Sequence, residues 1–160
     1  MIHGRITMAE ISRVKFIRRS AGFTLIEILI VLVIMAILVS VAFPGYEDSM
    51  RKSARMAAKG ALMDVVSRQE QYFMNNKTYA DSLVALGLPD PYYVDRKNDR
   101  VNSSDANRVY QLTLANVTTT TFDALATPLH RQVEDVCGSY TLKADGSRAV
   151  SGSPGASVCW

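Results

Sequence analysis

The chain has 160 residues, of which 48% are hydrophobic and 21% are charged, with nine glycines and five prolines. These proportions are those of a globular protein and exclude the disordered, collagen and coiled-coil classes. The formal net charge is +3, but residues 1–22 hold five lysines and arginines against one acidic residue, which leaves 13 basic and 14 acidic side chains in the remainder. Without that segment, no net positive charge indicates general nucleic-acid binding. Two cysteines are too few for a disulfide scaffold or a zinc site.

An apolar run extends from Phe23 to Phe43 and contains a single charged residue, Glu27. A helix of this length spans a bilayer core of roughly 30 Å. The basic segment before the run keeps residues 1–22 in the cytoplasm and sends the rest of the chain outward. Because no A-x-A-like site follows the run, it differs from an ordinary secretory signal peptide. The simplest interpretation is a single-pass membrane anchor.

Glu27 does not fit a simple anchor. A carboxylate in a membrane helix costs on the order of 2.5–3.5 kcal/mol near the centre of the bilayer, so it normally has a partner. The apolar run itself contains no cation. Cleavage between Gly22 and Phe23 would create one, because the new α-amino group would lie about one helical turn from Glu27 or beside the Glu27 of a neighbouring chain.

The string RRSAGFTLIEILIVLVIMAILVSVAFPGY, residues 18–46, resembles the class III signal of type IV prepilins and pseudopilins. It has a basic leader that ends in Gly22, followed by Phe23, by Glu27 four residues later, and by Pro44 at the end of the apolar run. The resemblance implies that the membrane-embedded prepilin peptidase cleaves after Gly22 and methylates the amino group of Phe23. It also implies that the apolar helix polymerises into a filament, with Phe23, Glu27 and Pro44 taking part in subunit assembly.

The same resemblance divides the chain into three parts. Residues 1–22 form a cleaved basic leader, residues 23–44 a transmembrane and polymerisation helix, and residues 45–160 a periplasmic or extracellular head. The resemblance further implies the type IV pilin fold, in which a long N-terminal helix packs on a small antiparallel sheet.

An amphipathic pattern continues beyond the apolar run. Apolar residues recur at three- and four-residue spacing, with charged residues between them. These apolar positions are Met50, Ala54, Ala57, Ala58, Ala61, Leu62, Val65, Val66, Tyr72 and Phe73. The pattern predicts one helix from Phe23 to about Asn76, roughly 80 Å long, whose second half lies against the head. Because Pro44 removes one backbone hydrogen bond, we expect a kink or a locally melted turn at Pro44 and Gly45.

The rest of the head reads as loops and strands. Residues 79–89 resemble a turn and a packed loop, and residues 95–107 a polar connection. Alternating or β-rich segments predict strands at 109–115 and 120–129 and a hairpin of 139–143 with 147–150. A three- or four-stranded antiparallel sheet packed on the amphipathic half of the helix gives an α+β head.

Cys137 and Cys159 lie in the part of the chain expected outside the membrane, where an oxidising compartment favours pairing. A bridge between them would stabilise the head by about 3 kcal/mol. The resemblance to type IV pilins implies the same bridge, which closes a C-terminal loop. The ending Q-x-x-D-x-C-G…C-W, which comprises Gln132, Asp135, Cys137-Gly138 and Cys159-Trp160, looks most like that of PilE-type minor pilins.

Other chemistry is less well supported by the sequence. A nucleophile formed by Cys137 with His130 requires a free thiol, which an oxidised cysteine lacks. Oxygen-bearing residues between Asp95 and Asp105 have the character of calcium ligands but not the spacing of an EF-hand, so a solvated loop is the better interpretation. Aromatic residues suited to stacking on DNA bases are better read as core. These are Tyr72, Phe73, Tyr79, Tyr92 and Tyr93. We expect no catalytic residue, cofactor or metal.

The sequence therefore predicts a structural subunit, a minor pilin, of a type IV pilus that serves twitching motility, adhesion or DNA uptake. Its expected partners are other pilin subunits, the prepilin peptidase and the inner-membrane assembly platform. The subunit would wait in the bacterial inner membrane with its head in the periplasm and then enter the surface filament. Two alternatives stay open, a pseudopilin of a type II secretion system and a DNA-binding minor pilin of a competence pilus.

A nucleic-acid partner has no support from the charge pattern. A DNA-binding head would favour a basic stripe, but the basic residues between 96 and 108 are interleaved with acidic ones. The basic residues are Arg96, Lys97, Arg100 and Arg108, and the acidic ones are Asp95, Asp99 and Asp105.

Overall fold

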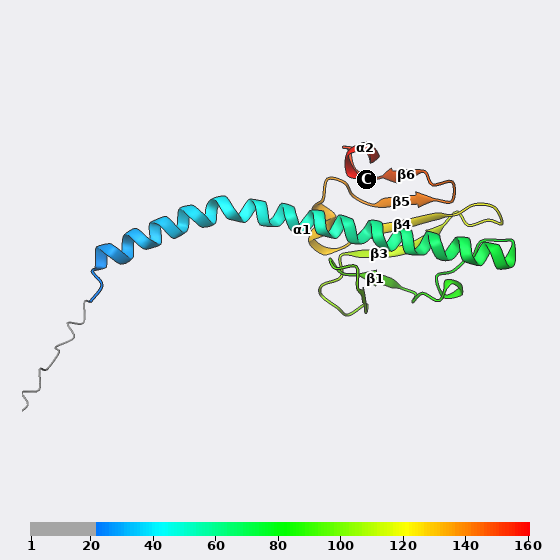
Figure 1. The fold of residues 1–160 in the computed structure, drawn as a ribbon, viewed down its shortest axis with the longest axis horizontal. Helices are drawn as coiled ribbons and strands as arrows, with labels where there is room; N and C mark the ends of the chain where they lie inside the picture. The colour runs from blue at the N-terminus through cyan, green and yellow to red at the C-terminus, as the bar shows by residue number, and fades with distance from the viewer. Residues whose placement is uncertain (1–21) are drawn as a thin grey trace, which may run out of the picture. The chain divides into compact units, whose positions relative to one another are not determined.

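The computed structural model describes residues 22–160 (Figure 1). The chain divides into two compact units, the first ending at Ser40 and the second extending from Val41 to Trp160. Helix α1, Leu25–Asn76, contributes to both units. It is long and apolar enough to cross a membrane, judged by length and composition, and it lies near the N-terminus.

In the described part of the first unit, residues 25–40 form the apolar start of α1. Its side chains are exposed in the single chain, among them Leu25 at 85% and Leu38 at 60%. The hydrophobic effect strongly disfavours so long an apolar surface in water. This part of the helix therefore needs a membrane or other apolar helices around it.

Helix α1 is continuous through Pro44 and Gly45, so the locally melted turn expected there is not formed. A single missing N–H removes one hydrogen bond, and the helical residues on either side keep the backbone in register. The C-terminal end of α1 at Asn76 matches the prediction. Lys77, with a φ of 60°, follows it, and its N–H donates to the carbonyl of Phe73 at 2.8 Å.

The head part of α1 buries the predicted face. Its buried residues recur at the spacing of a helix, and most are alanines, which let the helix approach the sheet closely. They are Ala54, Ala57, Ala58, Ala61, Leu62 and Val65. Gln69, also fully buried, exchanges two hydrogen bonds of 2.8 and 2.9 Å with the backbone of Ala80 and so fixes the chain as it leaves the helix.

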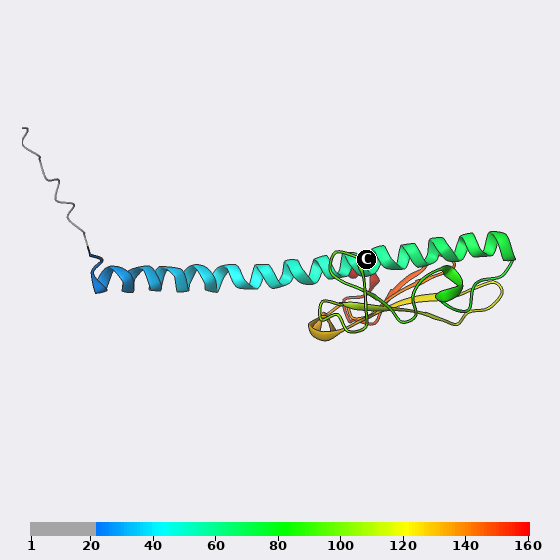
Figure 2. The ribbon, with the colours of Figure 1, turned by 90° about the horizontal axis from the view of Figure 1, so that it is seen from below.

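The sheet has six antiparallel strands in the order β2-β1-β3-β4-β5-β6. The strands are β1 Tyr92–Val94, β2 Arg100–Val101, β3 Tyr110–Ala115, β4 Asp123–Pro128, β5 Tyr140–Lys143 and β6 Arg148–Val150. Figure 2 shows the head part of α1 as one layer and the sheet as the other. Two short 3-10 helices, η1 Val84–Leu86 and η2 His130–Glu134, and a C-terminal helix α2, Ala156–Cys159, complete the head.

The predicted antiparallel sheet is confirmed, but it has six strands and not the three or four that were expected. Strands β3 to β6 match the predicted segments, and β1 and β2 add to one edge. The sequence placed Arg100–Val101 in a polar connection because two residues have no detectable alternation. Pairing with β1, where Tyr93 faces Val101, supplies the hydrogen bonds that make this segment a strand.

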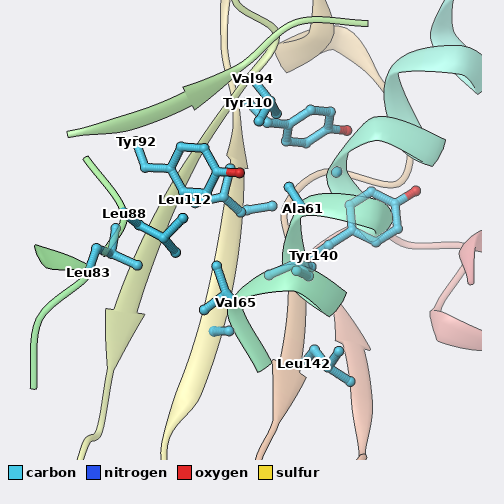
Figure 3. Close-up of a cluster of buried hydrophobic side chains, with 14 of the residues drawn as sticks. Ala61, Val65, Leu83, Leu88, Tyr92, Val94, Tyr110, Leu112, Tyr140 and Leu142 are labelled. Carbon is cyan, nitrogen blue, oxygen red and sulfur yellow. The ribbon is translucent and has the colours of Figure 1, made fainter. Parts of the chain in front are cut away.

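The core lies between α1 and one face of the sheet (Figure 3). Along β3 the alternation places Tyr110 and Leu112 in the core, and the paired β4 contributes Ala126, opposite Leu112. Tyr140 and Leu142 continue this face on β5. The α+β class predicted from the sequence is thus confirmed.

Candidate functional site

The start of α1 carries the residues expected to act in processing and assembly. Phe23 precedes the helix and is 77% exposed, and Gly22 has open space where a Cβ would stand. Thr24 is the residue before the helix, and its Oγ1 accepts a hydrogen bond of 3.2 Å from the N–H of Glu27. Thr24 followed three residues later by Glu27 is the sequence signature of an N-terminal cap, a signal that the sequence analysis did not use.

Glu27 lies in the first helical turn, where the helix dipole favours a negative charge. Among the described residues, no hydrogen bond or ion pair engages its carboxylate. Residues 1–21 of the predicted leader lie outside the described residues, and so does any contact they make. Pro44 is a helical residue of α1. The carboxylate thus remains available for a cation supplied by cleavage or by another chain.

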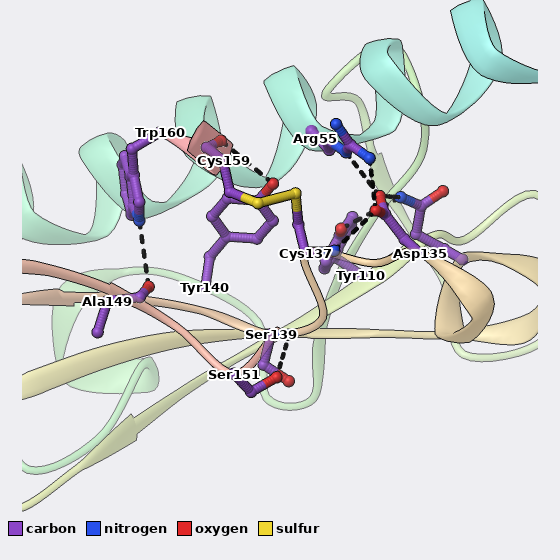
Figure 4. The surroundings of a disulfide bond; sticks show 11 residues. Arg55, Tyr110, Asp135, Cys137, Ser139, Tyr140, Ala149, Ser151, Cys159 and Trp160 are labelled. Carbon is purple, nitrogen blue, oxygen red and sulfur yellow. Dashed lines mark hydrogen bonds and ion pairs between the residues drawn. A yellow bond between two sulfur atoms is a disulfide. The ribbon is translucent and has the colours of Figure 1, made fainter. Parts of the chain in front are cut away.

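The second group of predicted residues is the disulfide. The sulfur atoms of Cys137 and Cys159 are 2.05 Å apart, so the predicted bridge is present (Figure 4). Both cysteines are almost completely buried. The bridge joins the segment after η2 to helix α2 at the C-terminus. It closes the loop that contains the hairpin β5–β6.

A buried ion pair beside the disulfide fastens this loop to α1. Arg55 donates two hydrogen bonds, of 2.8 and 2.6 Å, to the carboxylate of Asp135, whose side chain is fully buried. The N–H of Cys137 and the amide of Gln132 also donate to this carboxylate. Burial raises the pKa of Asp135, but the hydrogen bonds from Arg55 and Cys137 outweigh burial and hold it below the usual range. Figure 4 shows Arg55 and Asp135 facing each other.

This network gives a physical role to the Q-x-x-D-x-C pattern. Gln132 orients Asp135 and also donates to the hydroxyl of Tyr110 at 3.3 Å, so the pattern links η2, the sheet and the disulfide. Arg55 was not predicted as part of this network, because in the sequence it is one of several charged residues between apolar ones. No local signal identifies it, because its partner lies 80 residues away.

The chain end packs against the disulfide-closed loop. The indole N–H of Trp160 donates to the carbonyl of Ala149 at 3.1 Å, and its ring meets that of Tyr140 edge-on. Two cations lie over the Trp160 ring, Lys59 at 6.0 Å and Arg148 at 5.3 Å from its centroid. Burial first, and then repulsion from Arg55 and Arg148, lowers the pKa of Lys59. Two cations without an ion pair among the described residues therefore lie beside the Trp160 ring.

A second concentration of positive charge corrects the expectation that the head has no basic patch. A groove of about 760 Å³ is lined by four arginines and two glutamates. The arginines are Arg51, Arg96, Arg108 and Arg131, and the glutamates are Glu47 and Glu134. Asp95, which precedes Arg96 in the sequence, does not neutralise it. The Asp95 carboxylate instead accepts hydrogen bonds from the backbone N–H groups of Lys97 and Asp99 in its own loop.

The remaining sequence candidates have structural roles in the head. Cys137 is in the disulfide and therefore is not paired with His130 as a nucleophile. Asp105, one of the oxygen-bearing residues of the 95–105 segment, accepts a hydrogen bond from the backbone N–H of Asn107 in its own turn. Tyr92 is buried, and Tyr79 stacks on Phe73 at 4.8 Å. The preference for core over base stacking is thus confirmed for Tyr92 and Tyr79. It is wrong for Tyr93, which is half-buried on the opposite face of β1 and lies beside Arg108.

A long helix with an apolar first part, packed in its second part on an antiparallel sheet with a disulfide-closed C-terminal loop, defines a type IV pilin. Residues 17–43 match the prokaryotic N-terminal methylation motif. The chain belongs to the family described as the type IV minor pilin ComP, DNA uptake sequence receptor, whose model matches residues 44–141, more than half of the chain.

Similar curated proteins include both pilins and a secretion protein. The type IV wide pilus major component PilA4 of Thermus thermophilus is 38% identical over 74 residues, which cover 44% of this chain and 56% of that protein. The type IV major pilin PilA of Myxococcus xanthus is 33% identical over 74 residues, covering 46% and 34%. The type II secretion system core protein G of Dickeya chrysanthemi is 31% identical over 70 residues, covering 44% and 46%. The chain thus spans about a third to somewhat over half the length of these relatives.

A solved structure, a type IV pilin from Shewanella oneidensis, aligns with a TM-score of 0.46 and 21% identity. The alignment covers 69% of this chain and 97% of that one.

Proposed function

We propose that this chain is a minor subunit of a type IV pilus that assembles through the apolar part of α1. The observation that carries the proposal is the exposed apolar surface of that helix next to an N-terminal methylation motif. A membrane covers this surface before assembly, and neighbouring helices cover it in the filament. The role is structural, which agrees with the family, and we assign no catalytic step to the chain.

In this proposal residues 1–22 are the leader, residues 23–44 the assembly helix and residues 45–160 the head. Prepilin peptidase cleaves after Gly22 and methylates Phe23, and the new amine pairs with Glu27 of an adjacent subunit. An inner-membrane platform moves the subunit, with its head in the periplasm, into the surface filament. Similarity to secretion protein G keeps the pseudopilin alternative open, while the minor-pilin family match favours a pilus.

The first prediction concerns processing. The intact mass of the protein in sheared filaments should correspond to a chain that begins with N-methyl-Phe23 and retains the disulfide. Gly22→Val should leave the leader attached, because a branched side chain would stand beside the bond that the peptidase must cleave, while the chain's own structure has room for it. Gly45→Ala, which also lies in open space but far from the scission point, should be processed normally. Full-length protein in wild-type filaments would contradict the proposal.

A second candidate function, DNA reception, is favoured by the family description and by the charge around the chain end. Lys59 and Arg148 flank the Trp160 ring, and Arg148 is exposed on β6. Cations beside an aromatic ring suit a nucleic acid, because phosphates attract the cations and bases stack on rings. We propose that this end of the head contacts DNA.

The second prediction tests this contact with the processed chain in detergent and a labelled 20-base-pair duplex. Lys59→Gln/Arg148→Gln should weaken binding and reduce the slope of log affinity against log salt by roughly 1.8, as expected for two lost phosphate contacts. Arg96→Gln/Arg131→Gln removes the same charge elsewhere and should leave the slope unchanged. Equal effects of both variants, or no binding by the wild type, would contradict a DNA site at the chain end.

A further inference from the structure

The groove lined by four arginines lies within the second unit, beside the residues of α1 that follow the apolar run in sequence. Helix α1 contributes Tyr46 and Arg51, while the other arginines come from segments distant in sequence. Arg96 is in the loop between β1 and β2, Arg108 precedes β3, and Arg131 is in η2. The fold therefore gathers these cations beside the first residues of α1 that follow Phe43.

Within the described residues, Glu47 and Glu134 offset half of the groove's formal positive charge, and three of its four arginines form no ion pair. The guanidinium of Arg51 reaches Glu134 at 3.4 Å, a long contact to a carboxylate whose side chain is 72% exposed. No ion pair with the described residues engages Arg96, Arg108 or Arg131. Arg108 instead lies over the ring of Tyr93, with 5.4 Å between the guanidinium carbon and the ring centroid. The groove is therefore suited to an anionic ligand.

The position of the groove along α1 indicates which anion it meets. Arg51 lies eight positions after Phe43, a helical rise of about 12 Å. The polar headgroup layer extends roughly 5–8 Å beyond the hydrocarbon core on each side, and arginine side chains reach back toward it. Tyr46 is 61% exposed and lies between them, as aromatic residues do at a membrane interface. Tyr46 and Arg51, which line the groove, therefore follow the apolar run closely enough along α1 to reach the headgroup layer when residues 23–43 span the bilayer.

We propose that this groove binds the phosphate of an anionic phospholipid and thereby holds the head against the outward-facing leaflet until assembly removes the subunit from the membrane. A phospholipid suits this place better than DNA because of where residues 46–51 lie in α1. They directly follow the apolar part of that helix, which is in the membrane before assembly and among neighbouring subunits afterwards. The inference rests on the proposed membrane-anchored state, but not on any step of filament assembly.

The test uses the full chain in detergent, titrated with dioleoylphosphatidylglycerol or dioleoylphosphatidylcholine, with bound lipid counted by native mass spectrometry. The wild type should retain the anionic lipid preferentially. Arg96→Gln/Arg131→Gln should lower affinity for phosphatidylglycerol about thirtyfold, as expected for two arginines near a membrane surface. Lys59→Gln/Arg148→Gln, with the same change in charge outside the groove, should leave this affinity unchanged. Trp160 fluorescence during unfolding checks that both variants remain folded.

Three results would overturn the inference. The first is equal wild-type affinity for the two lipids, which requires no variant to interpret. The second is an equal loss in both double variants, which would show that net charge and not the groove binds lipid. The third is loss of binding to the 20-base-pair duplex by Arg96→Gln/Arg131→Gln with unchanged lipid affinity, which would make the groove a nucleic-acid site. Filament incorporation, measured separately, reports on the proposed function, so the two failures are distinguishable.

Discussion

Replacing Glu27 with alanine is expected to lower the incorporation of processed subunits into filaments more than a hundredfold. The carboxylate has no partner among the described residues. In the proposed filament the amine of a cleaved and methylated Phe23 would have no other counter-ion among apolar helices. Breaking one side of a buried ion pair costs roughly 3–5 kcal/mol, and each 1.4 kcal/mol is a factor of ten. Membrane insertion of the isolated subunit should improve, because a carboxylate in lipid is costly.

The deciding quantity is the ratio of processed protein in sheared filaments to processed protein in membranes. Glu27→Gln keeps the size of the side chain and removes the charge, so it should lower this ratio as well. Asp48→Ala removes an exposed carboxylate that pairs with Lys52 on the same helix, and it should leave the ratio nearly unchanged. Cleavage after Gly22 should continue in all three variants. If Glu27→Ala leaves the ratio unchanged, the inter-subunit ion pair is wrong.

The second large effect is expected at the ion pair beside the disulfide. Asp135→Asn should lower the free energy of unfolding of the head by about 3 kcal/mol, because Arg55 would lose its charged partner in a largely buried place. Denaturant unfolding of the processed chain in detergent, followed by the fluorescence of the one tryptophan, Trp160, measures this change. Glu134→Gln is the matched control, since its contact with Arg51 is exposed and should contribute less than 1 kcal/mol.

The same pair predicts an acid limit to stability. The folded-state pKa of Asp135 lies below its ordinary value of 3.8, so the ionised carboxylate stabilises the folded head. This contribution is fully present above pH 3.8 and is lost as the pH falls below that value through the folded-state pKa. Asp135→Asn should remove this part of the pH dependence, whereas Glu134→Gln should retain it. Parallel acid transitions in Asp135→Asn and the wild type would contradict the assignment.

Features with strong local signals were predictable from the sequence. The apolar run with its single Glu27, the amphipathic helix that ends at Asn76 and the strands from β3 onward all depend on residues within one or two turns or along one strand. The pairing of Cys137 with Cys159 was predictable because the chain has only two cysteines and its expected compartment is oxidising. In each case neighbouring residues or composition carry the information.

The short strands and the charged sites were decided by tertiary structure. Strand β2 has two residues and exists because β1 pairs with it. Arg55 meets Asp135 across 80 residues, and four separate segments bring the groove's arginines together. The alternation of signs between residues 95 and 108 indicated a neutral surface, but Asp95 turns to backbone N–H groups while Arg96 faces the groove. Sequence order does not record which way a loop side chain faces, and this direction decides where charge accumulates.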